Sequence, residues 1–115
     1  YACAMDGALV KFDLKSGERT VLADEYEGVR FNAPNDLVID RTGGIYFTDP
    51  RFRAPMPWPQ KIEAVYYRAA DGTVTRVIDE LNEKAPNGVI LSPDEKTLYV
   101  VSSMQDEVMT YPVES

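Results

Sequence analysis

Apolar residues along this chain alternate with polar ones or gather in short solid runs, and turn residues separate these segments. Alternation with a period of two is typical of half-buried strands, and the segments are rich in β-branched and aromatic residues. No segment shows the period of an amphipathic helix. The pattern predicts an all-β fold with nine strands, at residues 8–13, 19–22, 37–39, 45–48, 64–67, 74–78, 89–91, 97–101 and 107–111.

The predicted strands repeat along the chain. The motif Ala33-Pro34-Asn35 recurs 52 positions later as Ala85-Pro86-Asn87. A four-stranded unit that recurs at about 40–50 residues is typical of a β-propeller blade. We therefore expect a partial β-propeller of about two and a quarter blades. Residues 1–34 should hold the last two strands of one blade and a connection, 35–81 a complete blade, and 82–115 most of the next.

Composition and charge narrow the partners. The chain has 115 residues, with 12 Lys and Arg against 19 Asp and Glu, for a net charge of −7. Phosphate contacts need clustered cations, so we expect neither nucleic acid nor an anionic membrane as a partner. No apolar run approaches the roughly 18 residues of a spanning helix, and the opening lacks a signal-peptide pattern. We expect a soluble protein of undetermined compartment, and the first residue, Tyr1, suggests a truncated or excerpted chain.

The chain contains no histidine, which excludes several kinds of site within it. A Ser-His-Asp triad, a Cys-His pair and a His-ligated zinc site cannot be built here. The single cysteine, Cys3, offers no internal disulfide and is better explained as a small packed residue. Any chemistry must use carboxylates, amides, hydroxyls or a metal bound through oxygen, and oxygen ligands suit calcium and magnesium.

Asn35 and Asn87 are the candidate ligands for such a cation. The first strand of each propeller blade lines the central channel, so equivalent residues of successive blades point at one axis. Two amide oxygens would then converge, as a hard cation requires. The alternative is that both motifs are simple turns in which Asn bonds its own backbone. The sequence leaves these two interpretations evenly balanced.

Five segments closely resemble the SMP-30/gluconolactonase/luciferin-regenerating-enzyme family of propellers. They are residues 12–24, 30–40, 44–50, 85–88 and 91–100, and the resemblance covers nearly the whole chain in order. The resemblance implies part of a six-bladed propeller that binds a divalent cation, commonly calcium, in its channel. It also implies a lactone or sugar-acid substrate, since the best-known members hydrolyse sugar lactones.

The resemblance assigns roles to the two asparagines. Asn87 matches a metal ligand, and Asn35 matches a position that binds metal in some members and substrate in others. The family also uses a Glu from its first blade and an Asp from a later blade, which is usually cast as the acid/base. Neither position lies within this chain, so its catalytic residue is unknown and the resemblance leaves open whether the isolated chain is active.

Four further residues are candidate substrate contacts. Asn32 directly precedes the first motif, and Asp49 ends the predicted strand at 45–48 before Pro50, but a loop hydrogen bond and a turn cap are the simpler roles for them. Arg51 and Trp58 lie in a segment, 50–61, that holds four of the eight prolines and the only tryptophan. A long, stiff and locally basic loop of this kind is either a substrate lid or a packed surface loop.

Two hypotheses from different classes remain. The first is a calcium-dependent lactone hydrolase, of which this chain carries half of the metal shell. The second is a propeller that binds a ligand or partner without catalysis, which the missing carboxylates favour for the chain alone. Either way, a partial propeller leaves strand edges unpaired, so we expect self-association through the open blade edges.

Overall fold

The computed structural model describes residues 1–4, 6–51, 54–81, 84–104 and 107–113. Within these residues the regular structure consists of strands. They are β1 (Ala2–Ala4), β2 (Ala8–Phe12), β3 (Arg19–Ala23), β4 (Glu25–Tyr26), β5 (Val29–Arg30), β6 (Leu37–Ile39), β7 (Ile45–Asp49), β8 (Ala64–Arg68), β9 (Val74–Ile78), β10 (Pro86–Leu91), β11 (Thr97–Ser102) and β12 (Val108–Pro112). No helix in the described part of the chain is long and apolar enough to cross a membrane.

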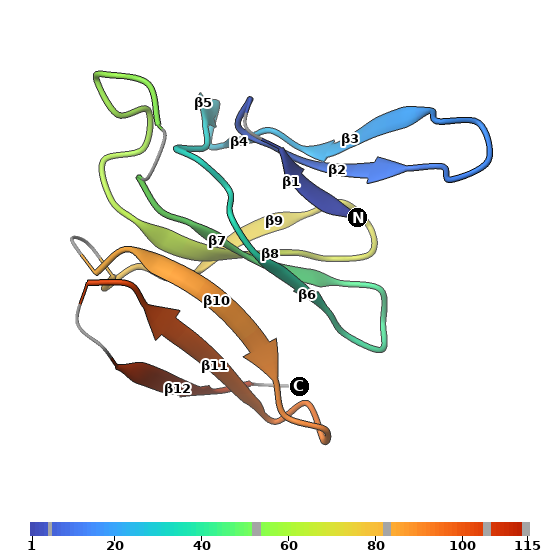
Figure 1. Ribbon diagram of the computed structural model, residues 1–115. Coiled ribbons are helices and arrows are strands. Elements are labelled where there is room, and N and C mark those ends of the chain that lie inside the picture. The colour runs from blue at the N-terminus through green and yellow to red at the C-terminus, as the bar shows by residue number, and fades with distance from the viewer. Residues whose placement is uncertain (5, 52–53, 82–83, 105–106, 114–115) are drawn as a thin grey trace.

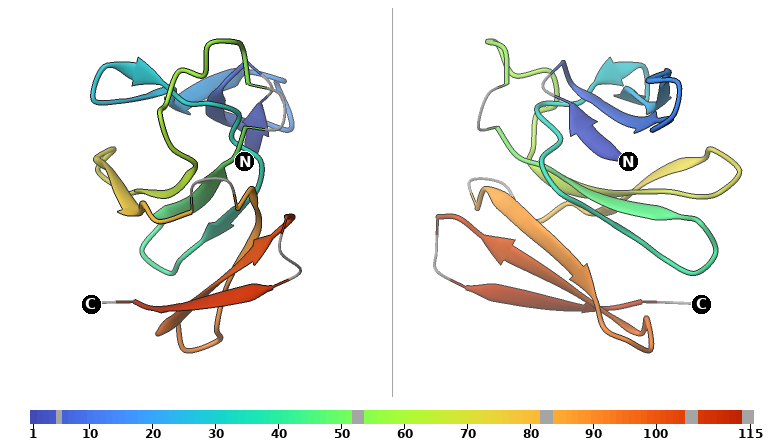
Figure 2. Two further views of the ribbon diagram at one scale, coloured as in Figure 1. Left: turned by 90° about the vertical axis from the view of Figure 1, so that its left-hand side faces the viewer. Right: turned by 45° about the vertical axis from the view of Figure 1, so that its right-hand side comes forward.

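The strands form three successive antiparallel sheets and one small hairpin. The sheet orders are β1-β2-β3, β6-β7-β8-β9 and β10-β11-β12, and β4 pairs with β5. Figure 1 shows the three sheets side by side in chain order. The two further views in Figure 2 keep that order. Up-and-down sheets that follow one another in this way are blades, so the predicted partial β-propeller is confirmed.

The nine predicted strands are all present, and three short ones were missed. β1, β4 and β5 have only three, two and two residues, too few for an alternating pattern to show. β1 pairs with β2, from Ala2 opposite Val10 to Ala4 opposite Ala8. The first sheet therefore has three strands, where the pattern predicted two within residues 1–34.

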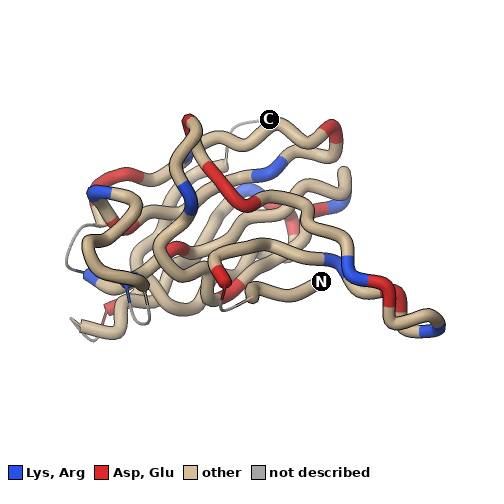
Figure 3. Tube along the Cα trace, turned by 90° about the horizontal axis from the view of Figure 1, so that it is seen from above, with Lys and Arg blue, Asp and Glu red and all other residues tan. Residues whose placement is uncertain are grey.

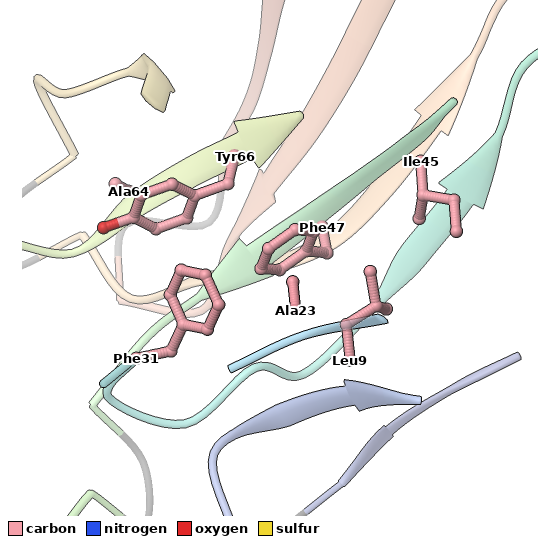
Figure 4. Packing of buried hydrophobic residues seen from close by; sticks show 7 residues of the cluster. All are labelled: Leu9, Ala23, Phe31, Ile45, Phe47, Ala64 and Tyr66. Carbon is pink, nitrogen blue, oxygen red and sulfur yellow. The ribbon is translucent and has the colours of Figure 1, made fainter. Parts of the chain in front are cut away.

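An aromatic cluster joins the first two sheets. Phe31 packs edge-on against Phe47 and Tyr66, with ring centroids 5.1 and 4.9 Å apart. Such edge-to-face pairs add about 0.5–1.5 kcal/mol each to the area they bury. Figure 4 shows these rings with four aliphatic neighbours, Leu9, Ala23, Ile45 and Ala64. Because Phe31 comes just before the first Ala-Pro-Asn motif, this core fixes where that motif begins.

A second cluster joins the second and third sheets. Its buried members come from both sheets and from the connection between them, namely Tyr46, Val65, Ile78, Leu81, Val89, Leu98 and Val100. Tyr46 and Val65 lie in the central strands β7 and β8, and Val89 lies in β10. This packing holds the start of β10 against the second sheet, which places the two Ala-Pro-Asn motifs near one another.

Candidate metal site

Asn35 and Asn87 come together at one end of the second and third sheets. Asn35 lies two residues before β6, and Asn87 is the second residue of β10. The Asn35 Nδ2 group donates a hydrogen bond to Asn87 Oδ1, and both residues are exposed. Among the described residues, neither side-chain amide bonds to the backbone of its own segment. The predicted convergence of the two amides is therefore present in the structure, while their metal binding stays a prediction.

The donor set fits part of a shell for a hard cation. Asn87 Nδ2 donates to Ser103 Oγ at 3.0 Å, which leaves its carbonyl oxygen directed towards Asn35. Rotation of the Asn35 amide by half a turn would present a second oxygen to the same point, because amide N and O are nearly isosteric. Both ligands would be neutral, and the described residues contain no group of three or more His, Cys, Asp and Glu that could hold a metal.

The backbone at Asn87 is released from its own sheet by a bulge. Pro86 pairs with Ser102 and Val89 with Val100, and the register shifts between them. Bulges re-aim side chains and leave backbone groups unpaired in the ladder. Here the Asn87 carbonyl accepts a hydrogen bond from Thr48 Oγ1 at 2.8 Å, and the Val89 N–H donates to Asp36 Oδ2 at 3.0 Å. The second sheet thus binds the third sheet at Asn87 and again two residues later, at Val89.

The two Ala-Pro-Asn motifs differ in backbone conformation. Ala85 has a φ of 49°, in the left-handed region that costs an L-residue about 1–2 kcal/mol. Its carbonyl accepts a hydrogen bond from the Ser103 N–H at 3.1 Å, and its own N–H lies 3.4 Å from Glu63 Oε1. Sparsely populated backbone conformations persist where surrounding contacts hold them, often at functional sites.

Asp49 is a fully buried carboxylate behind the first motif. It accepts hydrogen bonds from the N–H groups of Asn32 and Ala33, at 2.9 and 2.8 Å. Burial raises its pKa to about 7, against the lowering effect of those two hydrogen bonds and of the charges of Arg30 and Arg76. The residue therefore acts on the loop backbone in this structure. A contact with substrate stays a prediction.

Asn32 connects the first motif to the long β7–β8 connection. Its Oδ1 accepts the Gln60 N–H at 2.8 Å, and its Nδ2 donates to the Ile62 carbonyl at 3.1 Å. The residue is fully buried. The oxygen and the nitrogen of the amide thus both form hydrogen bonds within the protein, which is the loop hydrogen-bonding role expected as the simpler one. Substrate binding by Asn32 stays a prediction.

The β7–β8 connection is packed along part of its length. The Arg51 guanidinium stacks over the Trp58 ring at 4.1 Å and donates to the Lys61 carbonyl at 2.6 Å. The Arg51 N–H donates to Glu63 Oε2 at 3.0 Å. Trp58 keeps 44% of its surface exposed. Roles of Arg51 and Trp58 in substrate binding remain predictions, and residues 52–53 lie outside the described part.

Cys3 lies near this site but does not suit nucleophilic chemistry. Burial, with the nearby charges of Asp36 and Asp49, raises the pKa of its thiol to about 12. A thiol with so high a pKa is protonated near neutral pH, whereas the thiolate is the reactive form. The interpretation of Cys3 as a small packing residue agrees with this environment.

Four residues that hold the site were missed from the sequence: Asp36, Thr48, Glu63 and Ser103. In a strand, a residue next to Asn35 points to the opposite face, and the Asp36 carboxylate accepts the Val89 N–H of the third sheet. Thr48 precedes Asp49 in a strand, where successive side chains point to opposite faces. That alternation is the signal from which the direction of the Thr48 side chain could have been predicted. Neither Glu63 nor Ser103 belongs to a sequence motif that would mark it as a residue of the site.

A surface cleft lies away from the asparagine pair. A cleft of about 820 Å³ runs between the second and third sheets, and its lining includes Asp40, Tyr67 and Tyr111 but neither Asn35 nor Asn87. It borders the turn that precedes β7, at the other end of the sheet.

Figure 3 shows Lys and Arg positions spread among Asp and Glu positions along the described trace. The predicted lack of affinity for nucleic acid and membrane remains untested.

Comparison with known proteins adds the family. The model of the SMP-30/gluconolactonase/LRE-like region matches residues 1–115. A gluconolactonase of Zymomonas mobilis is 38% identical over 101 residues, which are 84% of this chain and 28% of that protein. A lactonohydrolase of Aspergillus oryzae is 39% identical over 100 residues, 83% of this chain and 22% of that protein.

Solved structures agree with the sequence relatives. A gluconolactonase from Xanthomonas campestris superposes with a TM-score of 0.89 at 32% identity, over 98% of this chain and 40% of that one. A luciferin-regenerating enzyme superposes with a TM-score of 0.67 at 21% identity, over 94% of this chain and 36% of that one, and shares the fold. The chain thus spans well under half the length of these relatives. It belongs to the SMP-30/gluconolactonase/luciferin-regenerating-enzyme-like family.

Proposed function

We propose that this chain contributes to a divalent-cation-dependent lactone hydrolase, with Asn35 and Asn87 as two ligands of a calcium ion. The observation that carries the proposal is the contact between these two amides, which lie 52 positions apart in the sequence. Relatives named gluconolactonase and lactonohydrolase support a lactone as the substrate class. Acidic charge elsewhere on the chain does not suit phosphate-rich partners.

The chain's own residues have defined tasks in this proposal. A bound divalent cation supplies a Lewis acid that polarises a carbonyl oxygen. Asn87 offers its Oδ1 because Ser103 occupies its Nδ2. Asn35 offers a second oxygen after its amide turns, and its backbone N–H stays bonded to the Thr48 carbonyl at 3.0 Å. The carboxylate that would activate water is not assigned to any residue of this chain.

Calcium binding is the first test. Titration calorimetry with Ca²⁺ on the 115-residue chain should give a Kd of about 10⁻³ M, the weak end of the range, because neutral amides lack carboxylate charge. Asn87→Ala should abolish the heat, and Asn87→Asp should tighten binding by adding charge. Asp71→Asn, in an exposed turn, is the control for calcium held loosely by acidic surface groups. Equal binding by wild type and Asn87→Ala would contradict the metal site.

Hydrolysis is the second test. Glucono-1,5-lactone should be supplied to the chain with calcium and, separately, with chelator. Chelator-sensitive turnover supports the hydrolase. Calcium binding without turnover favours the non-catalytic ligand-binding module for this chain by itself.

We also propose that the chain self-associates through blade edges. β12 pairs with β11 and has no second neighbour among the described strands. Val108 of β12 is 60% exposed, and Ile90 of β10 is 59% exposed. Unpaired edges and exposed apolar faces favour pairing with another copy. Light scattering should show mass that grows with concentration, and Val108→Lys should reduce it. A strictly monomeric species at high concentration would contradict this.

A further inference from the structure

Behind the two asparagines, one strand contacts both motifs. Thr48 lies in β7, is fully buried, and belongs to neither Ala-Pro-Asn segment. Its backbone carbonyl accepts the Asn35 N–H at 3.0 Å, and its backbone N–H donates to the Asp36 carbonyl at 3.0 Å. These two bonds extend the ladder between β6 and β7 to Asn35.

The Thr48 hydroxyl makes the connection to the other sheet. It accepts a hydrogen bond from the Asp36 N–H at 3.1 Å and donates one to the Asn87 carbonyl at 2.8 Å. A hydroxyl has one donor and two acceptor positions, so a single side chain can serve both partners at once. Without the hydroxyl, the Asn87 carbonyl would have no partner from the second sheet at this point.

The bulge in β10 makes that hydrogen bond necessary. The shifted register between Pro86 and Val89 leaves Asn87 outside the pairing with β11. Its backbone position is then set by contacts across the blade interface, from Thr48 to the Asn87 carbonyl and from the Val89 N–H to Asp36. Thr48 is the side chain that bonds both the Asn35 strand and the Asn87 residue itself.

We propose that Thr48 is a positioning residue that sets the spacing between the Asn35 and Asn87 amides and so the affinity of the cation they hold. This rests on the proposed calcium site. Partners behind the ligands of a metal typically change its affinity about 10–100-fold when removed. Neither hydroxyl bond can be formed by valine, which has nearly the same shape as threonine, whereas serine keeps the hydroxyl.

The experiment compares three variants at this position. Calcium titration at a temperature where each variant is folded should show Kd raised about tenfold or more in Thr48→Val and Thr48→Ala. Thr48→Ser should stay within about threefold of wild type, because it restores both hydrogen bonds. Thr48→Ala leaves no branched methyl to clash, so it covers the case in which the valine variant does not fold. Thr42→Val removes a hydroxyl bond to Asp40 at the opposite end of the same sheet and should leave Kd unchanged.

A second readout needs no metal. The side-chain amide signals of Asn35 and Asn87 in ¹⁵N–¹H NMR spectra of the calcium-free chain should move in Thr48→Val and Thr48→Ala and stay in place in Thr48→Ser. A purely structural role would lower stability in all hydroxyl-free variants while leaving Kd and these signals unchanged, and that result overturns the proposal. If wild type binds no calcium but the amide signals follow the hydroxyl, the calcium site fails and the positioning geometry stands.

Discussion

Asp40 and Asp49 lie at opposite ends of the β6–β9 sheet and have different roles. At the turn end, Asp40 binds the N–H groups of Thr42 and Gly44 within its own turn and accepts the Tyr67 hydroxyl at 2.6 Å. At the other end, Asp49 is fully buried and binds backbone 16 and 17 positions away. One aspartate shapes a local turn, and the other holds a loop that positions Asn35.

The pKa values of Asp40 and Asp49 are also shifted in opposite directions. Burial opposes ionisation at Asp40, but hydrogen bonds from Tyr67, Thr42 and Gly44 outweigh it and hold the pKa of Asp40 below its usual value. Burial dominates at Asp49 and raises the pKa there to about 7. The comparison teaches that a carboxylate near the candidate site is not by itself a free ligand or base, since this one already serves the backbone.

Removal of each carboxylate should give the largest difference in stability between the two ends of the sheet. Asp49→Ala leaves the Asn32 and Ala33 N–H groups without their carboxylate partner, at about 1–3 kcal/mol each, so the free energy of unfolding should fall by about 2–6 kcal/mol. Asp40→Ala should cost about 1 kcal/mol, because water can reach its partners in the partly exposed turn. Urea denaturation at about pH 4, where the folded protein keeps the Asp49 proton, measures both. Equal losses would show that burial does not distinguish the two ends.

Gly44, at the turn end of the β6–β9 sheet, and Gly88, in β10 beside the other end, should also respond differently to a Cβ. A Cβ on Gly44 would coincide with the Tyr67 hydroxyl and push it away from Asp40, so Gly44→Ala should cost about 1–3 kcal/mol. A Cβ on Gly88 would meet Val101 at 3.6 Å and Asp36 at 3.9 Å, which are ordinary contacts. Gly88→Ala should change stability by no more than about 0.5 kcal/mol. Thermal unfolding ranks the pair, and the reverse order would contradict these contacts.

The pH dependence of stability should have opposite slopes from the two aspartates. The folded protein keeps the Asp49 proton at pH values where the unfolded chain, with a pKa near 3.8, has lost it. The Asp49 contribution should therefore make the free energy of unfolding fall as pH rises from about 4 to about 7, then level off. The Asp40 contribution is present above its usual pKa and is lost as pH falls below it.

Matched variants separate these slopes in urea titrations across the pH range. Asp49→Asn should flatten the decline between about pH 4 and 7, and Asp40→Asn should reduce the loss of stability in acid. A wild-type decline that persists unchanged in Asp49→Asn would assign that proton to another group.

The sequence by itself determined the strands, the repeat and the family. Alternation is a local property, so β2, β3 and β6 to β12 could be predicted from it, and only strands of two or three residues escaped. The matching positions of Asn35 and Asn87 in two Ala-Pro-Asn motifs made convergence of their amides one of two evenly balanced interpretations, and the structure shows the two amides in contact. Equivalent positions in successive blades face the same central axis, because each blade repeats the same four-stranded unit.

Tertiary structure alone decided how that meeting is held. The bulge in β10, the left-handed backbone at Ala85 and the hydroxyl bridge from Thr48 to Asn87 depend on how the second and third sheets pack. The burial of Asp49 also follows from packing, because desolvation depends on neighbours contributed by distant segments. Contacts between residues 39 to 53 positions apart leave no mark in a local pattern, so the scaffold behind the asparagines became visible only in the folded chain.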